Sequence, residues 1–197
     1  MTDKTVVVSC GIFRDELAAL ERAGKFPWPV HYLDSMLHMD PVLLERAMTE
    51  MVRSLEGKRI VLIFGDCQVR MDRLTAGARV CRVDGHNCCD IVLGDEEYRR
   101  LRREGAFFLL PEWSVRWKEI FRERLGFTTR EGARLFMGEM HRRIVYLDTG
   151  VRPVPTATLA EIGSYFGLPV EVVAVSPQRL ADAVMRALEE FHDRHLL

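Results

Sequence analysis

Short apolar runs alternate along this chain with longer segments of helical period, and this alternation limits its fold more than any other feature. Residues 60–64, Ile-Val-Leu-Ile-Phe, are apolar at every position, which is typical of a parallel strand covered on both faces. Helical segments with one apolar face separate most of the runs, and that order indicates βα units on a mainly parallel sheet. The runs that we predict as strands are residues 5–10, 30–34, 60–64, 79–83, 106–110, 143–147 and 170–175.

The length of the chain and its apolar content predict one globular domain. Its 197 residues suit one domain of ordinary size, and 48% of them are hydrophobic, which is enough for a full core. No linker rich in Pro, Gly or Ser interrupts the pattern. We therefore expect a single α/β domain over residues 1–197, with one doubly wound, mainly parallel sheet flanked by helices.

The least regular part of the chain is residues 105–140, where aromatic residues gather in two predicted helices. The segment could be a cap or lid over a site, or the aromatic part of the core. The core is favoured, because two of its tryptophans are four residues apart and share one helical face. The aromatic residues are Trp113, Trp117, Phe121, Phe127 and Phe136.

The balance of charge argues against two classes of partner. The chain carries 28 Lys and Arg against 29 Asp and Glu, and it has no run of five like charges. It lacks the bulk positive charge that holds nucleic acid and the polybasic segment that anchors a protein to a membrane. The start of the chain has no apolar stretch suited to a signal peptide, and no span approaches the roughly 20 apolar residues of a transmembrane helix. We expect a cytoplasmic protein whose partners are neither nucleic acid nor membrane.

Three cysteines follow predicted strands at the point where each strand ends. Cys10 ends the first strand, Cys67 comes after the third and Cys88 after the fourth, while His38 follows the second. Because the carboxyl ends of parallel strands meet at one edge of a sheet, we expect these side chains to lie together. Three thiolates and an imidazole suit zinc or an iron–sulfur cluster. The sequence therefore predicts a cysteine-ligated metal site.

The remaining cysteines and a second histidine leave alternatives open. Cys81 lies inside a predicted strand, where a thiol usually packs as a small apolar group. Cys89 is adjacent to Cys88 and could replace it as a ligand, and His86 competes with His38 for the fourth position. The five thiols are an odd number in a chain without an export signal, so a disulfide framework is not expected.

Polar residues at the same strand ends are candidates for binding a substrate or cofactor. Those that follow the third and fourth strands are Asp66, His86 and Asn87; those after the sixth are Asp148, Thr149 and Gly150, which could equally form a plain turn. The chain contains no Walker A loop, dinucleotide fingerprint, G-x-S-x-G elbow or H-E-x-x-H motif. Nucleotide binding of those kinds, serine hydrolysis and zincin chemistry therefore have no support.

Six short motifs occur along the chain in this order: Ser9-Cys10-Gly11, Leu37-His38, Gly65-Asp66-Cys67, Gly85-His86-Asn87-Cys88, Phe107-Phe108-Leu109-Leu110-Pro111 and Val145-Tyr146-Leu147. In order and approximate spacing they resemble an uncharacterised prokaryotic family, domain of unknown function 1638. The resemblance extends to about residue 175, and it implies that Cys10, Cys67 and Cys88 are the motif cysteines and His38 the recurring histidine. Relatives often have an aromatic residue and a glutamate after the last motif cysteine, where this chain has Cys89 and Asp90, so the choice between Cys88 and Cys89 stays open.

The family resemblance implies a setting for the predicted site. Members look to be companions of corrinoid-dependent methyltransferases, so we expect a zinc or iron–sulfur protein that acts in or beside corrinoid-linked methyl transfer. The implied partner is a corrinoid protein or a methyltransferase, and a corrinoid could itself be a cofactor. Two alternatives stay open: a metal-free thiol redox protein that uses Cys67 and Cys88, and a non-catalytic adaptor whose aromatic segment docks on a methyltransferase.

Overall fold

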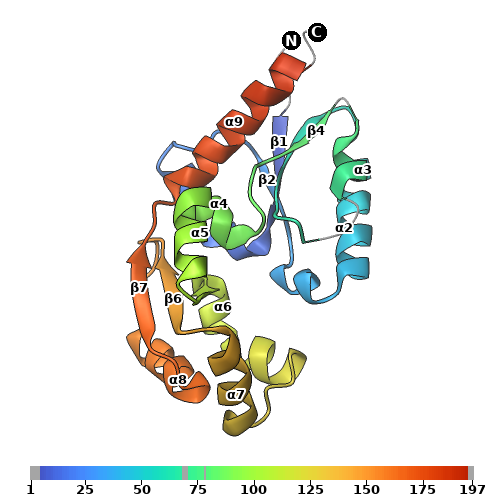
Figure 1. The fold of residues 1–197 in the computed structure, drawn as a ribbon. Helices are drawn as coiled ribbons and strands as arrows, with labels where there is room; N and C mark the ends of the chain where they lie inside the picture. The colour runs from blue at the N-terminus through green and yellow to red at the C-terminus, as the bar shows by residue number, and fades with distance from the viewer. Residues whose placement is uncertain (1–4, 68–70, 78, 195–197) are drawn as a thin grey trace. The chain divides into compact units, whose positions relative to one another are not determined.

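The computed structural model describes residues 5–67, 71–77 and 79–194, and it confirms an α/β fold built on parallel strands. The expectation of one sheet needs correction, because the seven predicted strands form a four-stranded and a three-stranded sheet. The chain divides into two compact units, Met1–Val92 with Pro177–Leu197, and Leu93–Ser176 (Figure 1). An apolar run identifies a strand but does not specify which other strand it pairs with, so this division could not be read from the runs.

The first unit contains a parallel sheet of four strands in the order β2-β1-β3-β4. The strands are β1 (Thr5–Cys10), β2 (Val30–Leu33), β3 (Arg59–Ile63) and β4 (Val80–Arg82). From β1 the chain moves to one side to form β2, then crosses back to place β3 and β4 on the other side. The strand order therefore reverses between β1 and β3, which is the position where open α/β sheets bind their ligands.

Helices cover both faces of this sheet, as the fully apolar β3 requires. Residues Ile60 to Phe64 are at most 1% exposed. The C-terminal helix α9 (Gln178–Arg194) packs on β3, β4 and α1 (Arg14–Arg22), and α2 (Pro41–Ser54) and α3 (Met71–Thr75) lie on the other side (Figure 1). Short helices η1 (Gly11–Phe13), η2 (Ser35–Met39) and α4 (Cys88–Leu93) follow β1, β2 and β4.

Helix α2 begins at Asp40-Pro41, a pair that the sequence alone marks as a helix cap and first-turn proline. Asp40 Oδ1 accepts hydrogen bonds from the backbone N–H groups of Val42 at 3.1 Å and Leu43 at 3.0 Å, and Pro41 takes the first helical position. An aspartate cap followed by proline satisfies or removes donors that have no partner in the first helical turn.

The second unit contains the parallel sheet β5-β6-β7, formed by β5 (Ala106–Leu109), β6 (Arg143–Asp148) and β7 (Val170–Ala174). Its helices are α5 (Asp95–Arg103), α6 (Pro111–Val115), the π-helix η3 (Lys118–Arg124), α7 (Arg130–Met140) and α8 (Thr156–Phe166). Strand order follows chain order here, so this sheet has no reversal.

Aromatic residues of segment 105–140 form much of the core of the second unit. Trp117 and Phe121 are 3% and 2% exposed, and Phe121 packs edge-on against Phe166 with the ring centroids 5.3 Å apart. These contacts favour the core interpretation over a lid, although Phe136 is exposed.

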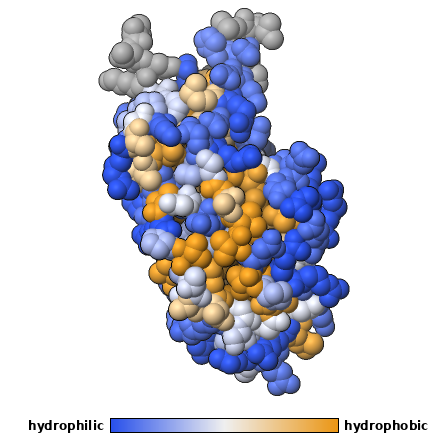
Figure 2. Space-filling model, turned by 90° about the vertical axis from the view of Figure 1, so that its left-hand side faces the viewer, coloured by the Kyte–Doolittle hydropathy of each residue, from blue (hydrophilic) through white to orange (hydrophobic). Residues whose placement is uncertain are grey.

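Apolar side chains also reach the surface, as the orange areas of Figure 2 show. The exposed ones include Val172 of β7 and Met185 of α9. None of the helices among the described residues has the length and apolarity needed to cross a bilayer.

Candidate functional site

Four loops of the first unit bring the predicted ligands to the carboxyl edge of its sheet. Cys10 is the last residue of β1 and Cys88 the first of α4, while Cys67 lies in the loop after β3. His38 lies in η2, which follows β2. Each side chain therefore comes from a different strand end, as the positions along the chain predict.

These four side chains are joined by hydrogen bonds in the order His38, Cys67, Cys88, Cys10. We call this set the thiol row. The structure thus brings together the four residues that the sequence singles out as metal ligands, and their role as ligands stays a prediction. Cys10 is 8% exposed, Cys67 and Cys88 are half-buried, and His38 is exposed to solvent.

Two glycines allow the loops to approach closely enough for these contacts. A Cβ on Gly65 would lie 2.3 Å from Asn87 Cα and 2.6 Å from the carbonyl oxygen of His86. A Cβ on Gly11 would lie 2.8 Å from the carbonyl oxygen of Leu33. Both separations are too short for any side chain, so the glycines beside Cys67 and Cys10 are there for close packing of the backbone.

The hydrogen bonds in the thiol row shift the proton affinities of its members in opposite directions. Hydrogen bonds from Cys88 and His38 lower the pKa of Cys67 to about 5, against the opposing effect of its burial. The bond to Cys67 raises the pKa of His38. Hydrogen bonds to Cys10 and Cys67, together with burial, raise the pKa of Cys88, which keeps its proton. Of Cys67 and Cys88, Cys67 is therefore the thiol that ionises more readily.

The members of the row contact one another in pairs and do not gather tightly around one point. Among the described residues, the Sγ and imidazole nitrogen atoms of the row include no three that all lie within 4.8 Å of one another. Cys67 and Cys88 are the central pair, and His38 and Cys10 are the ends. A single ion would therefore contact the central pair first.

Asp66 joins the loop that carries Cys67 to the loop that precedes Cys88. Its Oδ1 lies 2.8 Å from Arg82 Nη1 and its Oδ2 lies 3.3 Å from His86 Nδ1. Its backbone N–H also donates to the carbonyl oxygen of His86 at 2.8 Å. Asp66 thus holds the two loops together, a role that its position in the sequence does not reveal.

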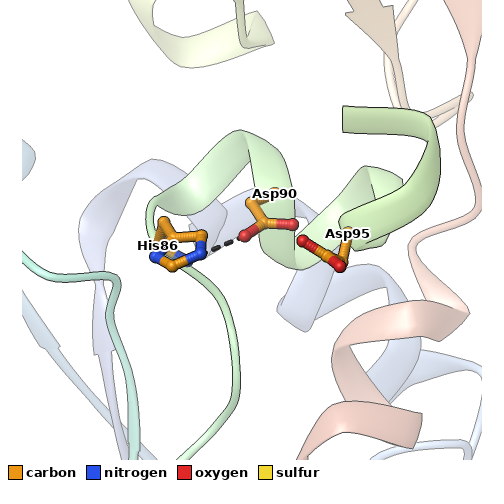
Figure 3. A group of neighbouring side chains, drawn as sticks. All are labelled: His86, Asp90 and Asp95. Atoms are coloured by element: carbon orange, nitrogen blue, oxygen red, sulfur yellow. Dashed lines mark hydrogen bonds between the residues drawn. The ribbon is translucent and has the colours of Figure 1, made fainter. Parts of the chain in front are cut away.

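His86 and Asn87 immediately precede α4. The Oδ1 of Asn87 accepts from the N–H groups of Cys89 at 3.0 Å and Asp90 at 3.1 Å, as a helix cap. The carboxylate of Asp90 accepts in turn from the His86 N–H at 2.8 Å, as Figure 3 shows. Asp95, also drawn there, is the first residue of α5 and belongs to the second unit.

The other two cysteines lie outside the thiol row. Cys81 is buried in β4 with its Sγ 3.7 Å from the carbonyl oxygen of Ile60, as expected of a core thiol. Burial raises the pKa of Cys89 to about 12, and it is Cys88 that hydrogen-bonds to Cys67 and Cys10. This geometry favours Cys88 over Cys89 as the third member.

The remaining predicted binding residues, Asp148, Thr149 and Gly150, belong to the second unit. Asp148 Oδ1 accepts from the Gly150 N–H at 2.9 Å, and Thr149 is buried. This hydrogen bond is the kind that closes an Asx turn, which favours the turn interpretation.

Arg82 is a residue of the site that the sequence did not indicate. Besides its ion pair with Asp66, its Nη1 donates to the carbonyl oxygens of Phe64 and Gly85, both at 3.4 Å. The available signal was an arginine between two apolar residues, Cys81 and Val83, in the predicted strand 79–83.

Comparison with curated proteins and with solved structures gives no match. A family model described as "Protein of unknown function (DUF1638)" matches residues 32–184, a span that includes His38, Cys67 and Cys88 and begins after Cys10. Because this span is most of the chain, the protein belongs to the DUF1638 family.

Proposed function

We propose that the thiol row binds one thiophilic metal centre per chain, a zinc ion or an iron–sulfur cluster. The observation that carries the proposal is the continuous contact of three thiols and one imidazole from four separate loops at the strand-order reversal. Cysteines that only pack in a core do not have to meet one another at the edge of a sheet. Metal ligands that come from distant parts of the chain do have to meet, because they bind the same metal centre.

The chemistry of the donor set fits such a centre. Cys₃His is an established ligand set for zinc, and thiolates also hold iron–sulfur clusters. Cys67 loses its proton readily, since its pKa is lowered to about 5, and it would be the first ligand to engage a cation. Cys10 and His38, at the ends of the row, would complete the set by side-chain rotation.

The residues around the row would act on the site in distinct ways. The hydrogen bond to Cys67 raises the pKa of His38, and Asp66 and Arg82 hold the Cys67 loop against the Cys88 loop. A zinc ion held there would activate a bound thiol or water by lowering its pKa.

Metal analysis of anaerobically purified protein tests the proposal. We expect close to one zinc, or the iron of one cluster, per chain. Cys67→Ser should lose most of it, because a hydroxyl is a poor ligand for a soft cation, and Cys81→Ser should retain it as the matched control. Equal metal content in the two variants, or substoichiometric zinc and iron in the wild type after reconstitution, would contradict the proposal.

A second candidate is a metal-free dithiol that cycles between Cys67 and Cys88. Their direct contact and the lowered pKa of Cys67 favour it. The Cys67 thiolate would attack one sulfur of an external disulfide, and Cys88 would then displace the second sulfur, leaving the protein oxidised and two thiols released. Oxidised glutathione is the probe: a Cys67–Cys88 disulfide in the peptide map of a metal-free wild type would support this candidate.

The setting of the site in corrinoid-linked methyl transfer is also a proposal, and the family resemblance alone supports it. In that setting the site would activate a thiol that accepts a methyl group, or pass an electron to an oxidised corrinoid. Methylcobalamin mixed with the protein and a small thiol tests the first role, because transfer to sulfur breaks the Co–C bond and changes the absorbance of the corrinoid. An unchanged spectrum with metal-loaded protein would count against it.

A further inference from the structure

A cavity of about 610 Å³ opens in the first unit beside Cys67. Its wall includes Asp66, Cys67, Asp72 and Arg82, together with the apolar side chain of Met71. The volume is in the range of small-molecule pockets, and the cavity lies at the carboxyl ends of β3 and β4. Of the thiol row, only Cys67 contributes to the wall that the described residues form.

The guanidinium of Arg82 lines this cavity and makes its hydrogen bonds to other described residues through one nitrogen. Within the described part of the chain, its side-chain bonds to Asp66, Phe64 and Gly85 all use Nη1. Its Nε and Nη2 form the edge of the guanidinium that grips a carboxylate with two parallel hydrogen bonds. The side chain is 24% exposed and lines the cavity, so a ligand in the cavity can contact it.

Asp72 supplies the opposite charge. It is exposed in α3 and makes no ion pair with any of the residues that the structure describes. Among the described residues of the cavity wall, two carboxylates, Asp66 and Asp72, stand beside one guanidinium, Arg82. With respect to these described groups, a simple anion can pair only with Arg82 and a simple cation only with a carboxylate, whereas a ligand that carries both charges can pair with Arg82 and Asp72 at once.

We propose that this cavity binds a small zwitterion, a molecule with one carboxylate and one ammonium group, and holds it beside Cys67 as the substrate of the thiol-row site. Arg82 donates to the carboxylate, and Asp72 pairs with the ammonium group. The substrate role rests on the proposed function, whereas binding itself does not require a metal.

Isothermal titration calorimetry on the full chain tests the proposal with defined probes. Glycine, β-alanine and γ-aminobutyrate carry the same two charges at increasing separation, and acetate and methylammonium carry one charge each. We expect at least one zwitterion to bind about 10-fold more tightly than either single-charge probe. The zwitterion that binds best then measures the spacing between the two charged groups.

Asp72→Asn removes the proposed ammonium partner without touching the loops. It should weaken zwitterion binding about 10-fold and leave acetate binding no weaker. Asp84→Asn is the matched control, since Asp84 is an exposed aspartate of the same unit outside the cavity wall and should retain wild-type affinity.

Absence of binding by all three zwitterions, or an equal loss in the two variants, would overturn the inference. Metal analysis of the same samples separates it from the proposed function. If the protein contains metal but binds no zwitterion, only the assignment of the cavity is wrong. If it binds a zwitterion but contains no metal, the cavity assignment is supported and the proposed metal centre is wrong.

Discussion

The two units contain parallel sheets of similar construction, yet their carboxyl edges differ in chemistry. In the first unit, this edge carries three thiols and an imidazole in contact. In the second, β5 is followed by Leu110 and the proline that begins α6, and β6 by the Asp148 to Gly150 turn. All five cysteines lie in the first unit. A parallel sheet edge is therefore not by itself a site.

Strand order accounts for part of this difference. The reversal between β1 and β3 separates the loops that leave those strands, so a ligand can lie between them. In the second unit each crossover continues in the same direction, and the loops follow one another without such a separation.

Glycine serves a different purpose at the two edges. Gly65 stands where a Cβ would overlap the backbone of Asn87, whereas Gly150 has a φ of +67° and no atom within 4 Å of the corresponding position. The first glycine permits contact between loops, and the second permits a left-handed turn. Only the first is needed for the thiol row.

The strongest test of this contrast is Gly65→Ala. Its methyl group would force the loops of Cys67 and Cys88 apart, so we expect a loss of about 1–3 kcal/mol in the free energy of unfolding and near-complete loss of metal. Urea unfolding and metal analysis measure the two effects.

Gly150→Ala is the control for that experiment. Its left-handed backbone should cost about 1–2 kcal/mol, with metal content unchanged. If both alanine variants kept their metal, the close approach at Gly65 would not be what assembles the row.

A smaller effect is expected for Asp66→Asn. The amide keeps the shape of the side chain but loses the ion pair with Arg82, so the Cys67 loop should be held less firmly. Because Asp66 is 54% exposed, we expect stability to change by less than about 1 kcal/mol, and metal affinity in chelator competition to fall about 10-fold.

Asp148→Asn makes the same change at the edge of the second unit, where an amide oxygen can still accept from Gly150. It should leave metal affinity at the wild-type value. An equal fall in affinity for both variants would show that the Asp66 contacts are not specific to the site.

Much of this arrangement could be predicted because its signals are local. The apolar run of residues 60–64, the Asp40-Pro41 helix start and the cysteines at strand ends each occupy a few adjacent positions. Strand ends of parallel units meet at one edge whatever the details of packing, which is why the thiol row could be inferred from Cys10, Cys67 and Cys88.

The rest depends on contacts between distant segments. Periodicity does not say that β5 pairs with β6 instead of joining the first sheet. Nor does it show that Arg82 would reach Asp66, 16 positions earlier in the chain, or that Cys88 and not its neighbour Cys89 would face Cys67. These outcomes are fixed by side-chain direction and loop packing.

One histidine from each unit, His38 and His141, gives the finest test of the comparison. In the first unit, the hydrogen bond to Cys67 raises the pKa of His38 above its ordinary 6.5. In the second, burial and then the charge of Arg102 lower the pKa of His141, which packs 5.2 Å from the ring of Phe107. In metal-free protein followed by NMR, the His38 ring should therefore titrate at higher pH than the His141 ring.

The same shifts have opposite consequences for stability. Folded protein holds the His38 proton more tightly than unfolded protein does, so this contribution is present below pH 6.5 and is lost as the pH rises through the folded pKa of His38. The folded state resists protonation of His141, so its contribution to stability is present above pH 6.5 and falls as the pH drops below that value.

Cys67→Ala should bring the pKa of His38 back toward its ordinary value and leave the pKa of His141 unchanged. An unmoved His38 in this variant would mean that the contact with Cys67 does not control its proton, and the link between His38 and the thiol row would be lost.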